Sequence, residues 1–194
     1  EMLIQFLAAA GILAVLTMVP GPDMAVVTKR AVASGWQDGL RTVGGITAGL
    51  LIWGVFSVAG LAAVLAASVT AYTAVKLTGA AYLVFLGVQS LLQSRRNRSQ
   101  APAPALSPPR GNPWRTGLVS NVFNPKIAVF YTGLLPTLAP TGLPAHSGMA
   151  LLVLVHAMLT AIWLGGYVLL LSKLAPSSRS RPYARAWTVS PGPY

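Results

Sequence analysis

Long apolar runs alternate with short polar segments along most of the chain. Five of these runs approach the length of about 20 residues that a helix needs to cross the hydrocarbon core of a bilayer. They lie at residues 2–28, 42–66, 73–93, 115–138 and 148–172. The second is the cleanest, because no charged residue occurs between Arg41 and Lys76. The pattern predicts an all-α polytopic membrane protein with five transmembrane helices.

Proline interrupts two of the five runs. The first run contains Pro20-Gly21-Pro22 followed at once by Asp23, and the fourth contains Asn124-Pro125 followed by Lys126. Proline in a helix interior lacks the amide hydrogen and costs roughly 3 kcal/mol. Within a bilayer, the carbonyl groups that it frees must find partners inside the protein. We therefore expect broken helices at both sites, and a charged residue beside each break favours transport of a polar solute.

Composition excludes several other classes of protein. Hydrophobic residues make up 54% of the chain and charged residues only 9%, whereas soluble domains have about 25% charged residues. The net charge is +11, but the basic residues sit between apolar runs and not on a soluble fold, so we do not expect nucleic acid as a partner. The chain has no Cys, two His and three acidic residues, which argues against a metal site or cofactor. No nucleophile–base pair or phosphate-binding loop is visible, so we do not expect an enzyme.

The basic residues follow alternate apolar runs. They are Lys29, Arg30 and Arg41 after the first run, Arg95, Arg96, Arg98, Arg110 and Arg115 around the third loop, and Lys173, Arg179, Arg181 and Arg185 after the last. Segments 67–72 and 139–147 carry no charged residue. The positive-inside rule places the basic segments and the tail in the cytoplasm and the N-terminus on the outer side. Arginines of the third loop are then expected to meet anionic lipid headgroups.

The chain divides into two halves around a proline- and arginine-rich linker. Residues 1–93 form a first three-helix repeat, 94–114 a cytoplasmic linker, 115–172 a second and incomplete repeat, and 173–194 a polar basic tail. A shift of 103 positions lays Pro22 to Val26 over Pro125 to Val129. Because the two copies break spans that run in opposite directions, the pattern is typical of inverted-repeat transporters.

Four motifs carry a resemblance to a known family. They are Val19–Asp23, Lys76–Leu83, Gly117–Asn121 and Asn124–Lys126, and the second run is also rich in glycine. In these motifs, and in their order over about residues 2–172, the chain resembles the lysine exporter / homoserine-threonine resistance (LysE/RhtB) family of bacterial amino-acid exporters. The resemblance implies export of amino acids or close derivatives, of the homoserine, threonine or neutral type, across the bacterial inner membrane. It also implies that the proton-motive force drives this export.

The last segment of the chain departs from the family pattern. The family has six spans, whereas residues 173–194 are polar, basic and rich in proline, with no run long enough to cross a bilayer. This tail resembles the product of a truncation or frameshift. An alternative interpretation is therefore a membrane fragment that does not transport. The residues leave the oligomeric state open, and a homo-oligomer is one candidate.

Asp23 and Lys126 are the first candidates for a substrate site. A lone charge at the centre of a membrane helix costs about 2.5–3.5 kcal/mol on insertion scales, so such residues pair or line a cavity. An amino acid is a zwitterion, for which Asp23 offers a partner for the ammonium group and Lys126 a partner for the carboxylate. Three alternatives stay open: Asp23 couples protons, Asp23 caps the helix after Pro22, or the two residues form a structural ion pair. Their positions within the spans suggest different depths.

Further candidates surround the breaks. Pro20, Gly21, Pro22, Asn121, Asn124 and Pro125 are predicted to line the substrate or proton pathway through exposed backbone and amide groups, with Ser120 offering a hydroxyl. Asn121 and Asn124 have a structural alternative, which is to bond the carbonyls that Pro125 frees. His156 within the last run is a candidate proton relay or a structural histidine. Gly45 and Gly49 have the spacing that permits close helix packing. Which amino acid is exported is not readable from these residues.

Overall fold

The computed structural model describes residues 1–96 and 111–174, and this part of the chain is helical, with no β-strand. The predicted all-α fold is therefore confirmed. Most of the predicted linker and of the predicted basic tail lies outside the described residues, and the proposed division into repeats stays a prediction.

Four helices form the part of the chain before the linker. They are α1 (Met2–Met18), α2 (Pro22–Ser34), α3 (Trp36–Ala67) and α4 (Val69–Arg96). The first break lies at Pro20–Pro22, as the sequence predicts, and α1 and α2 meet there at an angle of 51°. The charged segment after the first run is not a loop, because Gly35 alone separates α2 from α3. Gly35 has φ of 93°, a conformation that glycine adopts without steric cost.

The fourth apolar run is more divided than the sequence predicts. It contains α5 (Pro113–Val122), α6 (Pro125–Val129), the π-helical turn η2 (Phe130–Leu134) and the 3₁₀ turn η3 (Leu135–Leu138). The predicted break at Asn124–Pro125 is therefore confirmed, and the structure adds two irregular turns after it that the sequence did not predict. Pro136 lies within η3 and cannot donate to the carbonyl of Thr132, so regular α-helix cannot continue through this region. The last helix, α7 (Ala145–Leu174), is continuous.

Helix length and composition identify fewer candidate spans than the five that we predict from the sequence. In the described part of the chain, residues 36–60 of α3 and the whole of α7 are long and apolar enough to cross a membrane, and the bent pair α1–α2 is a third candidate. The other two predicted runs coincide with α4 and with the short helices from α5 to η3. Their role as spans stays a prediction.

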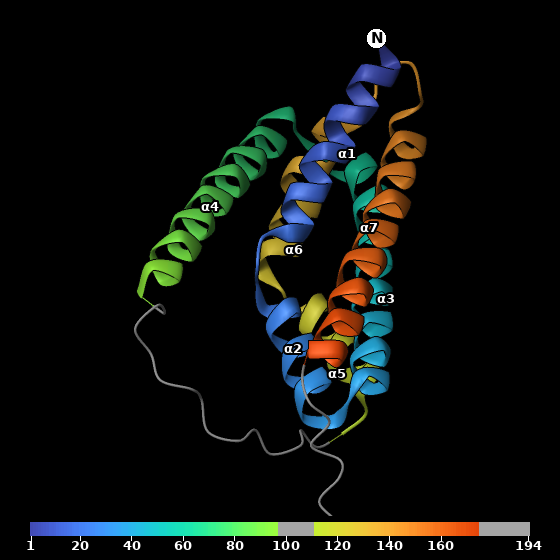
Figure 1. Ribbon diagram of the computed structural model, residues 1–194. Helices are drawn as coiled ribbons and strands as arrows, with labels where there is room; N and C mark the ends of the chain where they lie inside the picture. Colours follow the sequence, from blue (N-terminus) through green and yellow to red (C-terminus); the bar gives the residue numbers. More distant parts are fainter. Residues whose placement is uncertain (97–110, 175–194) are drawn as a thin grey trace, which may run out of the picture.

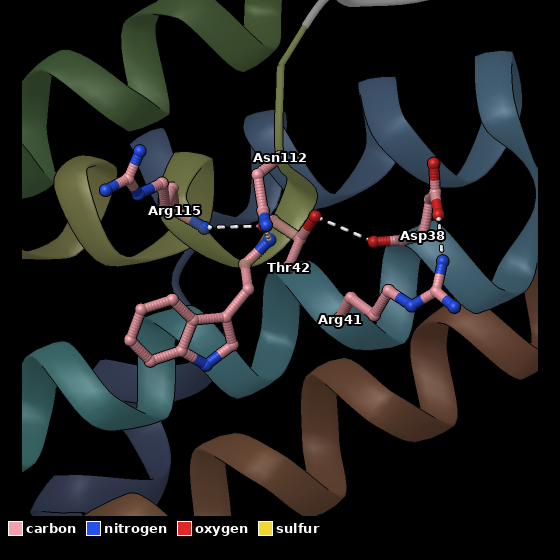
Figure 2. A network of polar contacts seen from close by, with 6 residues as sticks. Asp38, Arg41, Thr42, Asn112 and Arg115 are labelled. Carbon is pink, nitrogen blue, oxygen red and sulfur yellow. Dashed lines mark hydrogen bonds and ion pairs between the residues drawn. The ribbon is translucent and has the colours of Figure 1, made fainter.

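Very close packing joins α3 to α5. A Cβ added to Gly45 would lie 1.9 Å from the carbonyl oxygen of Trp114, and one added to Gly117 would lie 2.0 Å from that of Thr42. Figure 2 shows this junction, with Asn112 at the start of α5 beside Thr42 of α3. Asn112 Oδ1 accepts hydrogen bonds from the amides of Trp114 and Arg115 and so caps α5. Glycine on both helices brings the two backbones into contact.

Two apolar clusters form the core on either side of the breaks. The larger includes Leu13, Leu50, Tyr131 and Leu152, and the smaller includes Val27, Ile46, Leu164 and Val168. Helix α4 leans away from the other helices in Figure 1 and contacts them through α3, α6 and η2. The two clusters are therefore built from α1, α2, α3, α6, the turns η2 and η3, and α7.

The basic segments gather at one end of the bundle. Figure 1 shows α2, the beginnings of α3 and α5, and the last turn of α7 at the end opposite the N-terminus. These elements carry Lys29, Arg41, Arg115 and Lys173. Arg30 is different, because it is only 2% exposed and its Nη2 donates to Thr116 Oγ1 at 2.8 Å. Arg30 therefore joins α2 to α5 and is not a surface charge.

Candidate functional site

The first break leaves backbone carbonyls without their helical donors. In a regular helix the carbonyl of Leu16 would accept from residue 20 and that of Met18 from residue 22, but both of these residues are proline. Helix α1 accordingly ends at Met18, Val19 is extended, and α2 restarts with Pro22 in its first turn. The break thus creates the carboxyl end of one helix and the amino end of another inside the apolar part of the chain.

Lys126 occupies the carboxyl end of α1. Its Nζ donates to the carbonyl oxygens of Leu16 at 3.2 Å and Val19 at 3.1 Å. One of these is the carbonyl that Pro20 leaves without a donor. A cation at a helix carboxyl end also interacts favourably with the helix dipole, by about 0.3–1 kcal/mol. The side chain that follows the second break therefore satisfies the backbone of the first.

The second break is stabilised by asparagine. The Asn121 carbonyl cannot accept from residue 125, which is proline, and instead accepts from the amide of Asn124 at 3.0 Å. Asn124 Oδ1 accepts from the amide of Lys126 at 3.0 Å and so caps α6. This cap starts a new helix immediately after the break.

Asp23 reaches from the first break to the second. Its carboxylate accepts from Ser120 Oγ at 3.0 Å, from Asn121 Nδ2 at 2.8 Å and from Asn124 Nδ2 at 3.0 Å. The two side-chain amides therefore bond Asp23 and not the carbonyls that Pro125 frees. Hydrogen bonds to a charged group contribute about 1.5–3 kcal/mol each, so this carboxylate is held firmly between the two breaks.

The two charges of the site do not bond each other. In the residues that the structure describes, the ion pair within 4.0 Å is Arg41–Asp38 on α3, while Asp23 and Lys126 each bond neutral groups of the opposite break. The sequence suggests different depths for these two residues. The structure nevertheless brings both to one cavity, from α2 and α6.

This cavity lies between the breaks and α7. Its volume is about 30 Å³, and it is lined by Leu16, Thr17, Val19, Gly21, Asp23, Met24, Leu50, Asn121, Lys126, Ile127, His156, Thr160 and Leu164. Since one water molecule needs roughly 10–15 Å³ of such volume, the cavity has room for about two. An amino acid fits only after the surrounding helices move apart.

The predicted pathway residues divide into those that line the cavity and those that shape it. Asp23, Lys126, Gly21, Asn121 and His156 are among its lining residues. The prolines of both breaks and Asn124 are not, and they act on it by ending helices and bonding Asp23.

Gly49 makes room for one of the lining residues. A Cβ added to it would lie 2.6 Å from Asn121 Oδ1, so a larger residue would collide with the amide that bonds Asp23. That oxygen is buried and has no hydrogen-bond partner in the described part of the chain. Gly45, one turn before Gly49 on α3, packs against the backbone of α5 at Trp114.

His156 is held by an aromatic neighbour that the sequence did not single out. The imidazole is 1% exposed, and its Nδ1 lies 3.1 Å from the hydroxyl of Tyr131. The two rings stack with centroids 5.7 Å apart, and Phe130 packs edge-on at 5.9 Å. Thr160 was also missed, although its spacing of four residues from His156 places both on one face of α7.

The fold and this site define a helical membrane protein in which two broken helices place an acid and a base around one small cavity. The chain belongs to the family of LysE type translocators, whose family model matches residues 14–192. This match reaches into the basic tail, although residues beyond 174 lie outside the described part of the chain.

Relatives in several bacteria agree with this assignment. The uncharacterized membrane protein YrhP of Bacillus subtilis (strain 168) is 31% identical over 82% of this chain and 79% of its own length. The threonine efflux protein of Escherichia coli (strain K12) is 28% identical over 81% and 78% of the two chains. The leucine efflux protein of Salmonella choleraesuis (strain SC-B67) is 26% identical over 72% and 65%. No solved structure matches the chain.

Proposed function

We propose that the protein exports a small amino acid across the bacterial inner membrane and binds it in the cavity between the two breaks. The observation that carries this proposal is the meeting of Asp23 and Lys126 around one cavity. Threonine and leucine efflux by two of the relatives supports the class of substrate. An acid and a base that line one cavity match the two charges of a zwitterion.

Binding would exchange contacts within the protein for contacts with the substrate. The ammonium group of the amino acid binds Asp23, and its carboxylate binds Lys126, which then leaves the carbonyls of Leu16 and Val19. Because the cavity holds only about 30 Å³, the structure corresponds to a closed state. The two breaks are the natural hinges for opening, since their backbone is free of the regular helical hydrogen-bond ladder.

Protons are the proposed coupling ion. Asp23 and His156 both line the cavity, and carboxylate and imidazole side chains are the types that form proton relays in membrane transporters. The gathering of basic residues at one end of the bundle supports a cytoplasmic location for that end, with the N-terminus in the periplasm. Export from loaded cells should then stop when a protonophore collapses the proton gradient. Export that continues at the same rate would contradict proton coupling without contradicting export.

Substitution of Asp23 tests the assigned site. Asp23→Asn keeps the shape of the side chain but removes its charge, so export of labelled threonine from loaded vesicles should fall by at least tenfold. Asp38→Asn is the matched control, because Asp38 pairs with Arg41 at the protein surface away from the cavity. Equal export by the parent and by Asp23→Asn would refute the role of Asp23.

A second substitution tests the other charge of the site. Lys126→Met should weaken export to a similar extent, because the carboxylate of the substrate loses its partner. Lys29→Met is the control, since Lys29 is exposed on α2. If Lys126→Met exports as fast as Lys29→Met, the substrate does not need a cation at this position.

A further inference from the structure

One hydroxyl at the cavity lacks the hydrogen bond that other threonines of the bundle make. Thr17, Thr28 and Thr42 each donate to the carbonyl four residues earlier, at 2.7–2.8 Å. Thr160 also lies in the middle of a long helix, but within the described part of the chain its hydroxyl makes no hydrogen bond to the carbonyl of His156 or to any other group. The side chain is therefore oriented away from the carbonyl of His156, which it would otherwise bond.

The surroundings of Thr160 show what its hydroxyl can reach. The residue is only 6% exposed and it lines the cavity. Unlike Asn121 Oδ1, this hydroxyl is not fully sealed off by the surrounding protein in the described part of the chain. Because a buried polar group without a partner is costly, the cavity is the space that must supply one.

We propose that the Thr160 hydroxyl hydrogen-bonds the side chain of the bound amino acid and so favours a side chain that bears a hydroxyl. This inference rests on the proposed export function. Asp23 and Lys126 enter the cavity from α2 and α6 and take the two charged groups of the substrate, whereas Thr160 enters from α7. The side chain of the substrate is therefore the part that Thr160 is left to contact.

Other lining residues of the cavity define the shape of this subsite. Leu50, Ile127 and Leu164 line the same cavity with apolar surface. A hydroxyl that has no partner within the protein distinguishes threonine from valine, which has the same shape but a methyl group in place of the hydroxyl. A hydrogen bond of ordinary strength corresponds to a preference of about tenfold, and an apolar pocket alone cannot make this distinction.

Exchange in vesicles that contain the full-length protein tests the proposal with these two amino acids as probes. The parent protein should exchange threonine about tenfold faster than valine at equal, limiting concentrations. In Thr160→Val this ratio should fall to about one, whereas Thr160→Ser should restore the preference because it restores the hydroxyl. Thr47→Val is the matched control: Thr47 lies on α3, where its hydroxyl donates to the Val43 carbonyl at 3.0 Å, and its removal should leave the ratio unchanged.

Each contrary outcome has a distinct meaning. An unchanged ratio in Thr160→Val, with exchange still measurable, would overturn the role of Thr160 and leave the export function standing. Loss of threonine and valine exchange in equal proportion would also overturn it, because a side chain that only supports the fold acts on both substrates alike. A parent protein that exchanges no amino acid at all would overturn the export function and this inference together.

Discussion

Substitution of Gly117 by alanine should separate α3 from α5 and disturb the site through this movement. A Cβ at this position would lie 2.0 Å from the carbonyl oxygen of Thr42 and 3.1 Å from the amide nitrogen of Ile46. Both are backbone atoms, so no side chain can rotate out of the way. Ordinary contact begins at 3.4 Å, so the helices must separate locally by about 1.4 Å, the difference between 3.4 Å and 2.0 Å.

The size of the effect follows from this displacement. Forcing an extra methyl group into a packed interior costs about 1–3 kcal/mol. Helix α5 also carries Ser120 and Asn121, whose hydrogen bonds to Asp23 are 3.0 Å and 2.8 Å long. A shift of this size would stretch both bonds beyond their normal range. We therefore expect weaker amino-acid export as well as lower stability.

Thermal unfolding of the purified protein in detergent measures the loss of stability, and the midpoint should fall by about 2–4 °C for each kcal/mol lost. Gly166→Ala on α7 is the matched control, because a Cβ there meets nothing within 4 Å. Alanine is also a better helix former than glycine. If Gly117→Ala unfolds at or above the temperature of Gly166→Ala, the close contact between α3 and α5 does not limit stability.

Two further substitutions test single contacts of the site by thermal unfolding. Asn124→Asp keeps the cap on α6 but turns a donor to Asp23 into a second carboxylate, so it should destabilise more than Asn124→Ala. Asn112→Asp, at an exposed cap, should be neutral by comparison; equal stability of both aspartate variants would contradict the contact with Asp23. Tyr131→Phe should cost about 1–3 kcal/mol, because His156 Nδ1 loses its partner in a buried position. An unchanged midpoint would mean that His156 finds another partner.

The sequence predicts the places where the helices end because proline acts locally. Pro20 and Pro22 remove two backbone donors within three residues, and α1 indeed ends at Met18. Asn124 and Pro125 form a cap and a first turn, and α6 begins there. The later division of the fourth run was not predicted. A π-helical turn has no strong signature in one sequence, and the effect of Pro136 was overlooked.

The contacts between the breaks could not be predicted from the sequence. Asp23 bonds side chains about a hundred positions later in the chain, and Lys126 bonds carbonyls of α1. Both were identified as charges that need partners, but local chemistry does not specify which partners these are. For Asp23 the choice depends on where α5 lies, and Gly45 and Gly117 allow α5 to approach α3 closely.

Composition, apolar run length and proline were enough to establish a helical membrane protein with two interrupted helices and two charges in need of partners. These properties depend on each residue and its near neighbours in the chain, and so they can be predicted from the sequence alone. The packing of α2, α6 and α7 decided that both charges, His156 and Thr160 share one small cavity. Such a meeting depends on distances between elements far apart in the chain, which only close packing of the whole bundle determines.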